Sequence, residues 1–238
     1  TGGSRGIGLA IAKSYADAGA QVMITSRKED ALREAAAFVG GGASYVAGNA
    51  GDTEFAEKCV SATLEQFGKI DIFVNNAATN PYSGPTLDVS ESQFDKTFQV
   101  NLRGPLFWCS QVWAQHMKDN PGVIINIASV GGVAGARAGL AYTTSKHALV
   151  GMSKNIGFMY AQKGIRCNAI APGGVTTHIM DDAEPDQEGA ALCSSGAGSM
   201  PRMGESNEIA KVALFLASDD ASFVNGETLV ADGGWLAY

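Results

Sequence analysis

Short apolar runs alternate with longer stretches of mixed polarity along the chain. The apolar runs have the length of buried strands and lie at residues 21–25, 43–47, 70–74, 123–128, 165–171 and 228–231. Between them, apolar positions recur with helical spacing at residues 6–18, 28–39, 53–67 and 142–162. This strand–helix repetition predicts right-handed βαβ units. We therefore expect a doubly wound α/β fold, in which a parallel sheet has helices on both faces.

The start of the chain is unusual for such a fold. Thr1 is already the first residue of a glycine-rich turn, TGGSRGIG, that opens the first helix. A doubly wound sheet has its first strand immediately before this turn, and a sheet without that central strand has two unpaired edges in its core. We therefore expect the natural protein to contain one further strand upstream, within about 5–15 residues including its lead-in.

Residues 177–201 are the least regular part of the chain. A Ser/Gly/Ala-rich stretch follows five acids there, and one interpretation is a solvated surface loop. Loops at the carboxyl ends of parallel strands line the ligand crevice, so we favour the alternative of a mobile lid over a site. The acids are Asp181, Asp182, Glu184, Asp186 and Glu188.

Composition excludes several classes of protein. The chain has 238 residues, 45% hydrophobic and 17% charged, which excludes a disordered chain and is compatible with a single large domain over residues 1–238. Its 17 basic and 24 acidic residues give a net charge of −7, which argues against nucleic acid or an anionic membrane as partner. No apolar stretch reaches the roughly 18 residues that a membrane span needs.

The cysteines indicate neither disulfides nor a metal. They form no CxxC pair, and together with three scattered histidines they show no zinc-binding spacing, so we expect no metal site. Two of them, Cys109 and Cys167, lie in apolar runs and are expected to be buried. A reducing, cytoplasmic setting is the simplest inference. The four are Cys59, Cys109, Cys167 and Cys193.

The glycine-rich turn has the features of a phosphate-binding loop. Gly2 and Gly6 allow a sharp turn and a close approach of the backbone to a pyrophosphate, and Gly8 allows the helix to pack closely on the sheet. The helix N-terminus adds free N–H groups and a partial positive charge. The spacing is GxxxGxG rather than GxGxxG, and glycine-rich turns are common, so this motif alone is a weak signal.

The end of the second expected strand bears on the choice of cofactor. An acidic residue there would bind the ribose 2′-hydroxyl of NAD, whereas this chain has Ser26-Arg27-Lys28. Arg27 can form a bidentate pair with a 2′-phosphate, and Arg5 in the glycine-rich turn could reach the same group. The alternative interpretation is that Arg27 and Lys28 are ordinary solvated charges at the start of a helix. Because cations at a helix start oppose the helix dipole, we favour anion binding, and with it NADP, with NAD also possible.

A serine, a tyrosine and a lysine supply candidate chemistry. Ser129 follows the strand VIINIA, and Tyr142 and Lys146 are four residues apart, so on a helix they share one face about 6 Å apart. A neighbouring ammonium and a cationic nicotinamide ring would favour the phenolate of Tyr142 and lower its pKa. Tyr142 could then exchange a proton with an alcohol or carbonyl oxygen that Ser129 also holds.

Two asparagines complete the pattern. Asn76 lies in NNAA after the strand at 70–74, where a loop at the carboxyl end would meet a cofactor. Asn101 lies in the helical stretch FDKTFQVNLRG. Asparagine is a poor helix former, so we expect it to interrupt the hydrogen-bond ladder there. Each motif is weak alone, but their combination in this order is strong.

Taken together, these motifs resemble those of the short-chain dehydrogenase/reductase family, over essentially the whole chain. The matching pieces are TGGSRGIG, NNAA where the family usually has NNAG, Asn101, Ser129, YTTSK at 142–146, PGGVTT at 172–177 and FVNGETLVADGG. The resemblance implies a single Rossmann domain for cofactor binding and catalysis, and a tetrad of Asn101, Ser129, Tyr142 and Lys146. It also implies that Asn101 holds a water in a proton relay beyond Lys146.

The resemblance also implies the residues that bind the dinucleotide. Lys146 would bind the nicotinamide ribose, Val175 and Thr177 the carboxamide, and Asn49-Ala50 the adenine. The full cofactor set comprises Gly2, Ser4, Arg5, Gly6, Ile7, Gly8, Arg27, Asn49, Ala50, Asn76, Ala77, Tyr142, Lys146, Pro172, Val175 and Thr177.

Substrate and assembly are also expectations from the resemblance. The chain most resembles 3-oxoacyl-carrier-protein reductases and glucose dehydrogenase-like members. The five acids at 181–188 weigh against an acidic carrier protein, so a small ketone, secondary alcohol or sugar is equally compatible. A non-catalytic dinucleotide-binding regulator is the alternative class, but it would not need the tetrad. A homotetramer is implied, with pairing through the apolar helices around 93–117 and 145–160.

Overall fold

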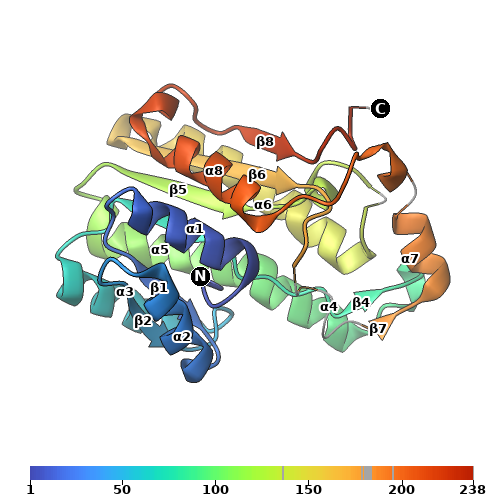
Figure 1. The fold of residues 1–238 in the computed structure, drawn as a ribbon, viewed down its shortest axis with the longest axis horizontal. Helices are drawn as coiled ribbons and strands as arrows, with labels where there is room; N and C mark the ends of the chain where they lie inside the picture. Colours follow the sequence, from blue (N-terminus) through green and yellow to red (C-terminus); the bar gives the residue numbers. More distant parts are fainter. Residues whose placement is uncertain (136, 178, 180–183, 195, 238) are drawn as a thin grey trace.

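The computed structural model describes residues 1–135, 137–177, 179, 184–194 and 196–237. Figure 1 shows a layered α/β molecule in which parallel strands are enclosed by helices. The strands are β1 (Met23–Ser26), β2 (Ser44–Ala47), β3 (Ile72–Asn75), β4 (Tyr82–Ser83), β5 (Gly122–Ile127), β6 (Ile165–Pro172), β7 (Glu184–Pro185) and β8 (Thr228–Ala231). The helices are α1 (Gly6–Asp17), α2 (Glu29–Val39), α3 (Thr53–Phe67), α4 (Glu91–Phe98), α5 (Gly104–Val112), α6 (Leu140–Tyr160), α7 (Gln187–Cys193) and α8 (Ser206–Ala217).

All strand pairs among the described residues are parallel, as the strand–helix repetition predicts. The order β3-β5-β6-β8 forms the larger sheet, β1 pairs with β2, and β4 pairs with β7. Each strand and helix predicted above is present, with both ends within two residues of the prediction. No prediction covered α8, although Glu205 and Glu208 form a capping box at its start.

The two faces of the larger sheet carry separate apolar cores, because successive side chains of a strand point to opposite faces. Ile124 of β5 packs with Trp108 and Val112 of α5 and with α3. Its neighbour Ile125 packs on the other face with α1 and α8. Helices α1 and α8 therefore cover one face, and α3, α5 and α6 the other (Figure 1). Cys109 and Cys167 are buried in the first core, as expected.

A ladder of polar side chains runs through the first core. The Asn75 amide donates to Asn126 Oδ1 at 2.9 Å, the Asn126 amide donates to Ser153 Oγ at 2.8 Å, and Ser153 donates to the Leu149 carbonyl. Asn126 and Ser153 are completely buried. Since every buried polar group needs a partner, this ladder fixes the position of α6 on β5. Both elements lead to the candidate residues Ser129, Tyr142 and Lys146.

A cavity of about 420 Å³ separates β1 from β3, and Ile24, Phe73 and Trp108 are among its lining residues. The first residues of the chain join the two strands: the Thr1 backbone nitrogen donates to the Val74 carbonyl, and the Gly3 amide donates to the Thr25 carbonyl. Within the described part of the chain, no helix is long and apolar enough to cross a membrane.

Candidate active site

Ser129, Tyr142 and Lys146 converge at the carboxyl end of β5. Ser129 lies two residues beyond this strand, and α6 begins at Leu140, so Tyr142 and Lys146 occupy successive turns of one helix face. The Ser129 hydroxyl lies near enough to the phenol of Tyr142 to influence its acidity. The Lys146 ammonium lies 5.5 Å from the centroid of the Tyr142 ring. The structure therefore brings together the three residues that the sequence pattern selected.

Burial changes the acidity of both titratable groups. The Tyr142 residue is half-buried, yet the loss of water around its hydroxyl raises its pKa to about 12. The nearby Ser129 hydroxyl acts in the opposite direction and lowers this pKa. Burial lowers the pKa of Lys146 to about 7. Its Nζ donates to the Ile127 carbonyl at 2.7 Å. We expect a lowered pKa for Tyr142 from the sequence, but in the protein without a cofactor burial outweighs that effect. A lowered pKa therefore requires positive charge beside the phenol.

Asn101 lies inside a π-helical turn between α4 and α5. This turn, η2 (Gln99–Arg103), confirms the predicted interruption of the helical ladder. The Asn101 carboxamide makes a reciprocal pair with Thr79: it accepts from the Thr79 amide at 2.8 Å and donates to the Thr79 carbonyl at 2.9 Å. It also donates to Ser145 Oγ, next to Lys146. No direct contact to Lys146 is found, so the water-holding role stays a prediction.

The glycine-rich turn has the geometry of a cradle. Gly2 and Gly6 have φ of +66° and +57°, which favour glycine. A Cβ on Gly8 would lie 2.3 Å from the Gly2 carbonyl oxygen, so only glycine fits there. Asn76 holds the turn by donating to the carbonyls of Thr1 and Gly2. Thr1 itself was missed by the sequence reasoning: its hydroxyl accepts from the amides of Asn76 and Ala77.

This cradle fits a pyrophosphate. Helix α1 has no side-chain cap and no acid in its first turn, so its first N–H groups are available to an anion. Ser4 lies in the turn, and Ile7 packs toward the sheet. The methyl group of Thr177 lies 3.7 Å from the place of a Cβ on Gly6, so the segment after β6 closes over the turn. The residues present therefore suit a dinucleotide.

The two arginines predicted to bind a phosphate lie on the surface. Arg27 follows β1 directly, is exposed and makes no ion pair with a described residue. Arg5 is the exposed N-cap residue of α1. Ser26 ends β1 and its carbonyl accepts from the Gly48 amide, which joins this corner to the loop after β2. No carboxylate belongs to the end of β1, as the sequence indicates.

The remaining predicted cofactor contacts lie at the same edge of the sheet. The Asn49 side chain accepts from the Gly51 amide, and the Ala50 carbonyl accepts from Trp108 Nε1. Pro172 ends β6, and Val175 forms a parallel bridge with Gly204. These contacts order the backbone of the predicted cofactor segments, and their roles toward a dinucleotide stay predictions.

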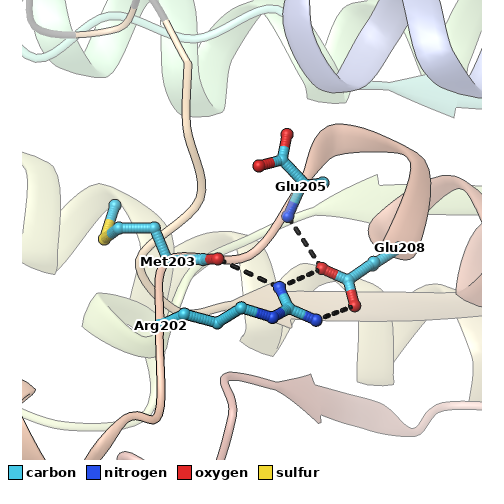
Figure 2. Close-up of polar contacts among 4 residues, drawn as sticks. All are labelled: Arg202, Met203, Glu205 and Glu208. Atoms are coloured by element: carbon cyan, nitrogen blue, oxygen red, sulfur yellow. Dashed lines mark hydrogen bonds and ion pairs between the residues drawn. The ribbon is translucent and has the colours of Figure 1, made fainter.

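The predicted lid contains short secondary-structure elements where it is described, and its mobility stays a prediction. Pairing of β4 with β7 joins it to the loop after β3, and Asp186 caps α7 by accepting from the Gly189 amide at 2.7 Å. Beyond residue 201, Arg202 forms two 2.7 Å hydrogen bonds with the Glu208 carboxylate, which also accepts from the Glu205 amide (Figure 2). This pair fixes the end of the segment to the first turn of α8. Asp181 and Asp182 lie outside the described residues.

The apolar helices that we expect at a subunit interface bury part of their apolar side chains in the core of their own subunit. Trp108, Val112 and Leu149 are at most 3% exposed, and the rings of Trp113 and Tyr160 pack together. Trp108, Val112 and Leu149 therefore belong to the core of the subunit and do not contribute to pairing with a second one. Large apolar side chains that do remain exposed on these helices are Phe94, Leu106, Phe107, Phe158 and Met159.

Comparison with known proteins identifies the family. The family model described as "Enoyl-(Acyl carrier protein) reductase" matches residues 2–236. A crystal structure from Sinorhizobium meliloti, titled as a short-chain alcohol dehydrogenase, shares 34% identity and a TM-score of 0.88, and covers 99% of this chain and 94% of its own. The chain belongs to the short-chain dehydrogenase/reductase family and has its single-domain Rossmann-like fold.

Curated relatives cover nearly the whole chain but differ in substrate. The 3beta-hydroxysteroid dehydrogenase 2 of Eggerthella lenta is 38% identical over 100% of this chain and 94% of its own. The L-rhamnose 1-dehydrogenase (NAD(P)(+)) of Azotobacter vinelandii is 36% identical over 98% of this chain and 94% of its own. The chain is thus an oxidoreductase of the family that acts on alcohols or carbonyls with a nicotinamide cofactor.

Proposed function

We propose that the protein is an NADP(H)-dependent oxidoreductase that interconverts a carbonyl and a secondary alcohol on a small free substrate of 3-oxoacyl type. The observation that carries the proposal is the convergence of Ser129, Tyr142 and Lys146: the Ser129 hydroxyl lies near the phenol of Tyr142, and the Lys146 ammonium lies 5.5 Å from the centroid of the same ring. Acid–base chemistry at a single oxygen atom needs these three functions: a proton donor, a second hydrogen bond and a nearby positive charge.

The residues have distinct tasks in the reduction direction. A bound reduced nicotinamide supplies a hydride to the carbonyl carbon. Tyr142 donates its proton to the carbonyl oxygen, and Ser129 donates a hydrogen bond to the same oxygen. A pKa of about 12 keeps Tyr142 protonated, which is the state that this step requires. The ammonium of Lys146 then stabilises the negative charge left on the phenol oxygen.

Two features support the choice of cofactor and substrate. The end of β1 has Ser26 and Arg27 instead of an acid, which favours a 2′-phosphate. The acids at Asp186 and Glu188 weigh against an acidic carrier protein, and so favour free small molecules. A second candidate is a sugar or small secondary alcohol, supported by the relative named L-rhamnose 1-dehydrogenase. We further propose a homotetramer in a reducing, cytoplasmic setting.

Tyr142→Phe tests the proposal. The variant retains the ring and its packing but has no proton to donate, so we expect kcat to fall by at least a hundredfold, roughly 2.7 kcal/mol of transition-state stabilisation. Binding of NADPH, measured by fluorescence, should change little. Tyr160→Phe removes a tyrosine hydroxyl from the other end of α6 and is the matched control. If Tyr142→Phe kept more than about a tenth of the turnover, the assignment would be wrong.

A further inference from the structure

An arginine and a tryptophan from distant parts of the chain meet beside the catalytic serine. Arg137 lies in the loop between η4 (Val130–Gly132) and α6, five residues before Tyr142. The centre of its guanidinium lies 5.1 Å from the ring centroid of Trp235, which follows β8 near the end of the chain. At this distance the guanidinium is a cation–π partner of the indole, which limits where its N–H groups can lie.

Trp235 is held rigidly in this position. The Asp232 carboxylate accepts from the amides of Gly234 and Leu236, and so shapes the turn that carries the indole. Trp235 is only 7% exposed, and its Nε1 is buried without a hydrogen-bond partner among the described residues. A buried N–H without a partner costs roughly 1–3 kcal/mol, so a group that accepts from it is the expected complement. The place of a Cβ on Gly196 lies 3.5 Å from this nitrogen, which puts the indole N–H beneath the predicted lid.

The pair lies close to the reacting groups. A Cβ placed on Gly131 would be 3.5 Å from Ser129 Oγ and 3.8 Å from the Cβ of Ala138, the neighbour of Arg137. On the other side, a Cβ on Gly173, just after β6, would be 2.7 Å from Asp232. The loop of Arg137 and the turn of Trp235 therefore border the same corner of the site, between Ser129 and the segment expected to hold the nicotinamide.

We propose that Arg137 and the indole N–H of Trp235 bind a carboxylate of the substrate. The proposal rests on the function proposed above and names its substrate class: an oxo acid that is reduced to a hydroxy acid. A guanidinium offers paired donors that match the two oxygens of a carboxylate, and the indole adds one donor beside them. The two residues are specificity determinants, because they bind a part of the substrate that does not react.

A carboxylate is favoured over a neutral polar group on electrostatic grounds. The chain has a net charge of −7, so its distant charges repel anions, but at physiological salt their effect is screened beyond about 8 Å. At short range the positive charge of the Arg137 guanidinium attracts a carboxylate. Both oxygens of Asp232, the nearest carboxylate of the C-terminal turn, already accept from backbone amides. The several N–H donors of a guanidinium allow Arg137 to bind a substrate carboxylate beside the contacts that it makes within the chain.

The first test does not depend on turnover. The chain has three tryptophans, so a nitrogen-15 correlation spectrum shows three indole N–H signals, and Trp235→Phe assigns one of them. We expect 4-oxopentanoate, added with NADP, to shift the Trp235 signal, and methyl 4-oxopentanoate to leave it nearly unchanged. In Arg137→Gln the same carboxylate should no longer shift the signal. Equal shifts with acid and ester, or none with either, would overturn the proposal.

The second test compares acids with their esters in NADPH-dependent reduction. The panel pairs 3-oxobutanoate, 4-oxopentanoate and 5-oxohexanoate with their methyl esters, because the spacing from carbonyl to carboxylate is the variable. For the best acid, Arg137→Gln should lower kcat/KM by about ten- to a hundredfold, mainly through KM, since a charge-assisted pair is lost. Arg137→Lys should restore part of this loss, and the esters should change less than threefold.

Arg103→Gln is the matched control. The guanidinium of Arg103 also lies 5.1 Å from an aromatic centroid, that of Phe107, but Arg103 is exposed. We expect the control to leave the ratio of acid to ester unchanged, with the assembly checked by light scattering. An equal loss for acids and esters in Arg137→Gln would reduce Arg137 to a structural role and overturn the proposal. Failure of the proposed function has a different result: the unaltered enzyme would reduce neither acids nor esters. The shift of the indole signal can be measured in that case too, so the carboxylate proposal is tested separately.

Discussion

Among the single residues, Lys146 makes the stability of the fold depend on pH, because burial of its charged amine lowers the free energy of unfolding. Its ordinary pKa of 10.5 falls to about 7 in the fold because burial penalises the ammonium. Between these two values the unfolded chain binds more protons than the native state, so stability from this group rises with pH. Below pH 7 both states are protonated, and burial of the charge carries its full cost.

This difference predicts the pH dependence of Lys146→Met. Because methionine does not titrate, the free energy of unfolding of the natural protein minus that of the variant should rise between pH 7 and 9. The slope should be roughly 1 kcal/mol per pH unit, measured by denaturant unfolding at fixed protein concentration. Lys154→Met removes an exposed lysine from the same helix and is the control. A difference that stayed constant with pH would contradict the lowered pKa.

The residues after β1 predict the preference between the two cofactors. Ser26→Asp with Arg27→Ile exchanges a site suited to a 2′-phosphate for one suited to a ribose hydroxyl. Loss of a charge-assisted contact of about 1.5–3 kcal/mol corresponds to one or two decades in affinity. The ratio of kcat/KM for NADPH to that for NADH should exceed one in the natural protein and fall by about tenfold or more in the variant. If kcat/KM were equal for NADPH and NADH in the natural protein, Arg27 and Arg5 would be ordinary surface charges.

The proximity of two side chains follows from the sequence alone where their spacing is local. Tyr142 and Lys146 are four apart on one helix, so their proximity follows from helix geometry alone. Arg137 and Trp235 are almost a hundred residues apart and share no periodic pattern, so only the folded chain brings them together. Thr1 escaped notice for the same reason, since its partners Asn76 and Ala77 belong to another strand end.

At the scale of elements, the π-helical turn at Gln99–Arg103 shows how one residue shapes a helix. Asn101 is fully buried and satisfies both backbone groups of Thr79. Asn101→Ala leaves these groups without partners, so the free energy of unfolding should fall by about 1–3 kcal/mol. Turnover should fall by at least tenfold, because the loop after β3 loses its anchor. Asn120→Ala, which removes an exposed bond to the His116 carbonyl, is the control and should change neither value appreciably.

The elements themselves were largely predictable because their patterns are periodic. The strand at Thr228–Ala231 and the helix at Thr53–Phe67 have the predicted bounds. By contrast, β4 and β7 are two residues long, which is too short for an apolar pattern, and they exist only because the loop after β3 meets the lid segment. Such pairing is a tertiary event, and no local signal in the sequence indicates it.

At the scale of the whole molecule, exposed apolar side chains predict assembly. Phe158 is 83% exposed and Met159 63%, near the end of α6, which supports pairing of α6 helices across subunits. We expect light scattering at micromolar concentration to give about four times the chain mass of 24.6 kDa. Phe158→Arg should lower this mass. Phe38→Arg places the same charge on an exposed phenylalanine of α2 and should not. A monomeric mass for the natural protein would contradict the prediction.

The ladder of Asn75, Asn126 and Ser153 constrains how this sequence can diverge. An apolar replacement of any one member leaves another buried group without a partner, and only replacement of the set removes the cost. Each single apolar substitution among these three residues therefore gives a variant of reduced fitness. Over evolutionary time the three positions are retained or replaced as a unit, so in related chains they should covary, although they belong to β3, β5 and α6.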